Sequence, residues 1–174
     1  MDNQFLKLIK TRRSCRRYKP EQISDEELTA VLEAGTWAPT GHGSQAPFIV
    51  AVQNEEQKQI LSRMNAEIMG VDSDPYYGAP TFVLVFAPID YANAVQDGSC
   101  ILENMMLAAH AIGLASCWIN REDRMFDSDE GRALMRQWGL PEGLKGIGAI
   151  SLGNALREPR EPKPRKEDYY RVVR

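Results

Sequence analysis

Four short apolar runs recur along the chain, and they constrain most strongly what it can fold into. Most of them are rich in β-branched residues and are bounded by turn residues, so each reads as a buried strand. The runs are PFIVAV (47–52), APTFVLVFA (79–87), ASCWI (115–119) and GIGAISLG (146–153). Together they predict one mainly buried sheet.

The segments around these runs space their apolar residues as helices do. Ser24 and Glu27 fit a capping box, and Gly35 with Pro39 ends the helix that begins there. The longest segment is apolar on much of its surface, which is typical of a central, covered helix. Helices are expected over 3–11, from 24 to about 35, and over 55–69, 93–113 and 123–138. This order of elements indicates an α/β or α+β sandwich.

The length of 174 residues predicts a single domain, residues 1–174, that can bury a real core. Residues 154–174 differ from the rest of it. Pro159, Pro162 and Pro164 forbid a regular helix there, so this C-terminal tail is expected to run extended over a surface.

Composition argues against several classes of protein. A formal net charge of -3 and 8% aromatic residues disfavour a nucleic-acid-binding protein. The apolar runs are too short to span a bilayer, and no signal peptide is visible. The three cysteines are widely spaced, which disfavours a disulfide scaffold or a structural zinc site. We therefore expect a cytoplasmic protein with reduced thiols and no membrane partner.

Against this acidic background, one short stretch near the start gathers positive charge. TRRSCRRYKP (11–20) contains Arg12, Arg13, Arg16, Arg17 and Lys19. A second basic cluster, KPRK (163–166), lies in the tail. Because an arginine guanidinium can donate two hydrogen bonds to phosphate oxygens, one hypothesis is that both basic clusters meet around a compact anion such as a phosphate monoester. The other interpretation is a solvated basic turn.

The segment GHGSQA (41–46) matches the residue pattern of a dinucleotide-binding fingerprint but lacks the flanking secondary structure that this fingerprint requires. That fingerprint needs a strand before it and a helix after it, whereas here a helix precedes and a strand follows. A flexible glycine-rich loop is the remaining interpretation. His42 and His110 lack metal-ligand spacing, and Cys15 has no identifiable base. We expect no catalytic side chain and no metal, and chemistry carried by a bound cofactor.

Four segments, taken in order, resemble the short form of the nitroreductase family of FMN-dependent NAD(P)H oxidoreductases. They are IKTRRSCRRYKP (9–20), AGTWAPTGHGSQAPFIVAV (34–52), GLASCWI (113–119) and LGNALREPREPKPR (152–165), and DPYYGAP (74–80) is also similar. The resemblance implies an α+β three-layer sandwich, with a central mainly antiparallel sheet flanked by helices. It also implies an intertwined homodimer with FMN at the interface.

The resemblance also implies which residues bind FMN. Around the phosphate and ribityl chain it places Arg12, Arg13, Ser14, Arg16, Lys163 and Arg165. From the partner subunit it brings Thr40, Gly41, Gly43 and Gln45, and beside the ring it places Asn65, Ile119, Asn120 and Arg121. Arg17 and Lys19 fall outside the matched motif and are expected to be solvated.

The function that this resemblance implies is a ping-pong oxidoreductase. Electrons would pass from NADH or NADPH through bound FMN to a small acceptor such as a nitroaromatic, quinone or enone. Two alternatives keep the flavin: a specialised enzyme of the same fold, dehalogenase-like or flavin-degrading, and a low-turnover flavin store or sensor. A third alternative is a basic binding module without a cofactor.

Overall fold

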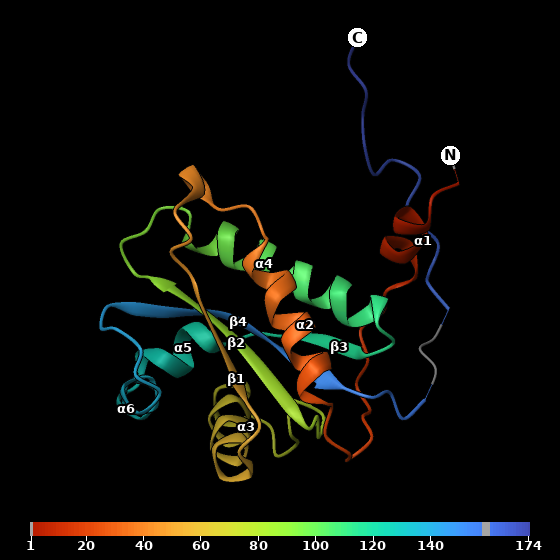
Figure 1. Cartoon of the computed structure of the whole chain (residues 1–174). Coiled ribbons are helices and arrows are strands. Elements are labelled where there is room, and N and C mark those ends of the chain that lie inside the picture. Colours follow the sequence, from red (N-terminus) through yellow and green to blue (C-terminus); the bar gives the residue numbers. More distant parts are fainter. Residues whose placement is uncertain (1, 158–160) are drawn as a thin grey trace.

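The computed structural model describes residues 2–157 and 161–174 and contains one antiparallel sheet (Figure 1). The sheet order is β1-β2-β4-β3, and every neighbouring pair is antiparallel. The strands are β1 (Phe48–Val52), β2 (Thr81–Pro88), β3 (Ala115–Ile119) and β4 (Leu144–Gly153). The four predicted strands are confirmed, with the two longest at the centre.

Alternation along β2 divides the core into two clusters. Phe82, Leu84 and Phe86 belong to one cluster, and Val83 and Val85 belong to the other. Successive side chains of a strand point to opposite faces, so both faces of the sheet must be covered. Helices on both faces give three layers, as predicted.

Two helices pack on the face of Val83 and Val85: α2 (Asp25–Thr36) and α4 (Ala94–Ala111). The capping box at the start of α2 is present, because Ser24 and Glu27 each accept a backbone N–H from the other. Helix α4 buries one broad side against the sheet, which agrees with its apolar sequence.

The opposite face carries α3 (Glu55–Met69), α5 (Glu122–Asp127) and α6 (Asp129–Gln137). The single helix predicted over 123–138 is therefore two helices. Ser128 is extended and caps α6 by accepting the N–H of Gly131. A Cβ at Gly131 would lie 2.2 Å from the carbonyl oxygen of Met125, so α6 packs directly on the backbone of α5. This close approach accompanies the break between the two helices.

The N-terminal segment and the tail lie together at one end of the molecule (Figure 1). Helix α1 (Gln4–Thr11) comes first, and the following segment runs beside the sheet edge. Ser14 bridges to Ser116 of β3, and Tyr18 bridges to Ala155 just after β4. The basic stretch is thus held in an extended form against the sheet. Among the described residues, helices fall short of the length and apolarity needed to cross a membrane.

Candidate functional site

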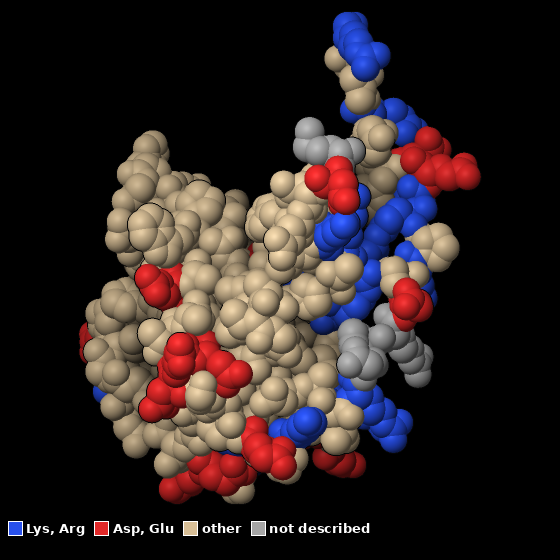
Figure 2. Space-filling model, turned by 45° about the vertical axis from the view of Figure 1, so that its right-hand side comes forward, with Lys and Arg blue, Asp and Glu red and all other residues tan. Residues whose placement is uncertain are grey.

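The two basic clusters line one hollow, although they come from opposite ends of the chain. This hollow of about 720 Å³ is lined by Arg13, Ser14, Cys15, Arg16, Arg17, Arg157, Glu161, Pro162, Lys163 and Arg165. Figure 2 shows lysine and arginine side chains gathered in a band along one edge of the molecule. Arg17, expected to be solvated, belongs to the same lining. We call this hollow and Arg12 beside it the basic clamp.

Two arginines at the clamp hold buried N–H groups that find no partner in the part of the chain that the structure describes. Arg13 donates through Nη1 to the carbonyl oxygens of Lys10 (2.7 Å) and Arg12 (2.6 Å). Arg12 Nε lies 3.9 Å from a carboxylate oxygen of Glu103. Yet Arg12 Nη1 and Arg13 Nε are buried and make no hydrogen bond within the described part of the chain. A buried hydrogen-bond donor that has no acceptor costs free energy, so this arrangement favours an anionic ligand.

Arg16 is oriented by an aromatic neighbour from the DPYYGAP turn. Its Nε donates to the hydroxyl of Tyr77 (3.3 Å), and its guanidinium lies 5.7 Å from the centre of that ring. The hydrogen bond to Tyr77 is the main reason that the pKa of Arg16 is raised. The turn therefore fixes one side of the basic clamp.

The segment 119–121, which comprises the last residue of β3 and the two residues before α5, is held by one buried amide, and we call it the β3–α5 loop. Asn65 of α3 is 0% exposed and donates through Nδ2 to the carbonyl oxygen of Asn120 (2.9 Å). Its Oδ1 accepts from Arg121 Nε at 2.7 Å. Asn65 thus shapes the loop expected beside the flavin ring; its own contact with that ring stays a prediction.

Sequence reasoning missed a buried acid directly behind this loop. Glu122, the first residue of α5, is fully buried, and its Oε1 accepts from the hydroxyl of Tyr76 at 3.0 Å. In the sequence an acidic residue in the first helical turn looks like an ordinary partner of the helix dipole. Only the tertiary packing reveals that it is enclosed.

The loop 40–45 is tied to the start of α4 by a second acid that the sequence did not single out. Asp97 Oδ2 accepts from the N–H of Gly41 (2.9 Å) and from the hydroxyl of Tyr91 (2.7 Å). The hydroxyl oxygen of Tyr91 also lies 3.1 Å from the carbonyl oxygen of Gly41. Thr40 and Gln45 line a separate hollow of about 430 Å³ beside α2.

Within one chain, the loop 40–45 does not reach the basic clamp. Thr11, beside the clamp, lies 2.8 Å from Nε2 of His110 near the end of α4. Gly41 contacts Asp97 near the start of α4, and Figure 1 shows the two regions at opposite ends of this helix. Thirteen residues of helix separate these contacts by about 20 Å. The basic clamp and the loop 40–45 therefore form two separate half-sites.

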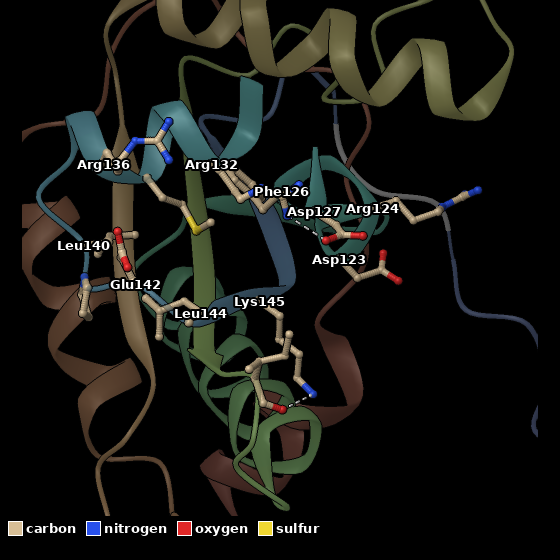
Figure 3. Close-up of a pocket in the computed structure, with 14 residues that line it drawn as sticks. Asp123, Arg124, Phe126, Asp127, Arg132, Arg136, Leu140, Glu142, Leu144 and Lys145 are labelled. Carbon is tan, nitrogen blue, oxygen red and sulfur yellow. Dashed lines mark hydrogen bonds and ion pairs between the residues drawn. The ribbon is translucent and has the colours of Figure 1, made fainter. Parts of the chain in front are cut away.

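A third hollow, of about 620 Å³, lies between α5, α6 and the start of β4 (Figure 3). Phe126, Met135 and Leu144 supply an apolar floor, and none of the predicted FMN-binding residues lines it. Three of its charged side chains are already engaged: Arg132 pairs with Asp127, and Lys145 donates to a backbone carbonyl. Its four basic side chains are accompanied by three acids, so its lining carries less net positive charge than that of the basic clamp.

Comparison with known proteins decides the family. Residues 9–154 match the family model described as "Nitroreductase family". The chain belongs to the nitroreductase family. The predicted α+β fold class is that of its structural relatives: a nitroreductase with bound FMN from Bacteroides fragilis superimposes with a TM-score of 0.91. That pair shares 34% identity over 99% of this chain and 100% of the other.

Two further relatives of this nitroreductase-family chain agree. A nitroreductase with bound FMN from Desulfitobacterium hafniense gives a TM-score of 0.88 at 29% identity, covering 99% of this chain and 100% of that one. A relative named "FMN reductase [NAD(P)H]" from Bacillus subtilis is 27% identical over 91% of this chain, which spans 57% of that protein.

Proposed function

We propose that this nitroreductase-family protein is an FMN-dependent oxidoreductase that uses NADH or NADPH to reduce a small acceptor. The observation that carries the proposal is the basic clamp, in which Lys163 and Arg165 meet the N-terminal arginines around one hollow. The FMN named in the structures of two relatives supports it. So does the NAD(P)H in the name of the Bacillus subtilis relative.

The residues present fit the phosphate of FMN. Arg12 Nη1 and Arg13 Nε are buried donors without partners among the described residues. Arg16, Lys163 and Arg165 add positive charge to the clamp, and Ser14 adds a hydroxyl. A phosphate accepts several charge-assisted hydrogen bonds at once, which satisfies these donors. The β3–α5 loop would hold the ring end through backbone groups of Ile119, Asn120 and Arg121.

When bound, FMN supplies the hydride and electron-transfer chemistry. The chain's own residues bind the phosphate, fix the β3–α5 loop and shape a site that two substrates occupy in turn. Nitroaromatics, quinones and enones are the acceptors that we propose. No side chain of this protein is assigned as an acid or base in that cycle.

We further propose that the working form is a homodimer. A two-fold axis across α4 would place the start of one α4 beside the end of its copy. The loop of Thr40, Gly41, Gly43 and Gln45 from one copy would then complete the basic clamp of the other. The separation of the half-sites within one chain supports this arrangement.

Anaerobic reduction tests the proposed function. Protein loaded with FMN is mixed with NADH or NADPH, and the visible flavin absorbance is followed. Bleaching, then recovery on adding a nitroaromatic, quinone or enone, is the expected result. Failure to take up FMN would refute the proposal. Uptake without bleaching by either nucleotide would favour a flavin store or sensor.

A further inference from the structure

Glu122 occupies a position where an ionised carboxylate is poorly stabilised. The residue is 0% exposed, and within residues 2–157 and 161–174 its Oε1 has a single side-chain donor, the hydroxyl of Tyr76. Its Oε2 is buried without a hydrogen-bond partner among the described residues. On the side of β4, a Cβ at Gly146 would lie 2.4 Å from the carbonyl oxygen of Glu122, so only glycine fits there. The carboxyl is enclosed between α5, β4 and the DPYYGAP turn.

Burial raises the pKa of Glu122 to about 8, because the charged form loses its hydration. The nearby carboxylate of Asp123 acts in the same direction. The backbone N–H of Glu122 itself, the Tyr76 hydroxyl and the charge of Arg121 act against it. The balance leaves a neutral carboxylic acid at neutral pH.

Glu122 lies between the β3–α5 loop and the basic clamp and is connected to both. Arg121, its neighbour in the chain, belongs to the β3–α5 loop and contacts Asn65. Tyr76 contacts Glu122, while the next residue, Tyr77, contacts Arg16 of the basic clamp. Tyr76 also stacks on Phe82 of β2, with ring centres 4.0 Å apart. The DPYYGAP turn therefore joins Glu122 to the basic clamp.

We propose that Glu122 is a positioning residue of the flavin site that works in its neutral form. Its ionisation would place an unscreened negative charge beneath the β3–α5 loop, and the site would then bind FMN less tightly. Reduction adds negative charge to the flavin, so the reduced cofactor would be disfavoured most. This inference rests on the proposed function, but the state of Glu122 can be measured without FMN.

The first experiment follows unfolding of the FMN-free protein by urea between pH 5 and 9. The folded-state pKa is raised above the unfolded value of 4.5, so the stabilisation is complete below pH 4.5 and is lost as pH rises through about 8. Between these values the unfolding equilibrium constant of the wild type should gain up to about tenfold per pH unit from this group. Glu122→Gln should lack this component, whereas the exposed control Glu142→Gln should keep it. Equal slopes in wild type and Glu122→Gln would overturn the proposal.

The second experiment measures the dissociation constant of FMN over the same pH range. Wild-type affinity should fall above pH 8 by up to about tenfold per pH unit, and that of Glu122→Gln should lack this fall. Tyr76→Phe keeps the ring stacking but removes a donor that lowers the pKa of Glu122, so its affinity should fall only at higher pH. It also serves as the test if Glu122→Gln does not fold. Parallel affinity curves would overturn the positioning role, and no FMN binding at any pH would overturn the proposed function instead.

Discussion

At the scale of single residues, the basic clamp depends on side chains from a tail whose described residues form neither helix nor strand. Arg165 contributes no packing to the core, so its replacement should affect ligand binding much more than folding. We expect Arg165→Ala to raise the dissociation constant of FMN about 10- to 150-fold, the equivalent of losing a charge-assisted hydrogen bond of 1.5–3 kcal/mol. Arg136→Ala, at an exposed arginine of α6, is the matched control. Titration calorimetry with FMN measures both, and equal affinity in the two variants would contradict the clamp.

Arg121 combines a useful contact with an unfavourable backbone. Its φ of 88° lies in the left-handed region, where glycine is at ease and other residues are strained. Arg121→Ala and Arg121→Gly both lose the hydrogen bond to Asn65, but only glycine relieves the backbone. Arg121→Gly should therefore be about 1 kcal/mol more stable than Arg121→Ala. Urea denaturation of the two variants decides; an alanine variant as stable as the glycine variant would show that the loop is not strained.

The residues that sequence reasoning found are those that stand out locally. Five basic residues within ten positions are visible without a structure, and so is the second basic cluster in the tail. Asp97 and Glu122 are single acids among 24 acidic residues, and their importance comes from burial against Gly41 and Tyr76. Burial of this kind depends on contacts between distant segments, which a spacing pattern does not report.

At the scale of elements, the loop 40–45 owes its shape to the start of α4. Asp97→Ala would leave the N–H of Gly41 and the hydroxyl of Tyr91 without their shared acceptor. We expect the amide of Gly41 to exchange hydrogen at least about tenfold faster, since a hydrogen bond to a charged group is worth about 1.5–3 kcal/mol. Gln96→Ala, at the exposed preceding residue of the same helix, is the control. Unchanged exchange at Gly41 in Asp97→Ala would show that the loop is held by other contacts.

Most elements were predictable because their patterns are local. The strand predicted over 47–52 and observed over 48–52 follows from a β-branched run, and the helix over 55–69 follows from helical spacing. The break within 123–138 was missed, although Ser128 followed by Asp129 and Glu130 is a local signal of a helix start. The close contact of Gly131 with the backbone of α5 accompanies this break and exists only once both helices pack under the sheet.

At the scale of the whole molecule, α4 separates the two half-sites, and neither can complete the other within one chain. The sequence motifs predicted the residues of both half-sites but not the distance between them, because that distance follows from how α4 crosses the sheet. The central claim is that the clamp of one copy and the loop of another form each flavin site.

Mixed dimers test this claim most directly. One chain carries Arg12→Ala with Arg165→Ala, the other carries Asp97→Ala, and each has its own affinity tag so that mixed dimers can be isolated. At an FMN concentration that loads the wild type but neither parent variant, we predict that mixed dimers bind FMN at half of their sites with wild-type affinity. In those sites an intact clamp of one chain meets an intact loop of the other. Mixed dimers that bind no more FMN than either parent would contradict the shared site.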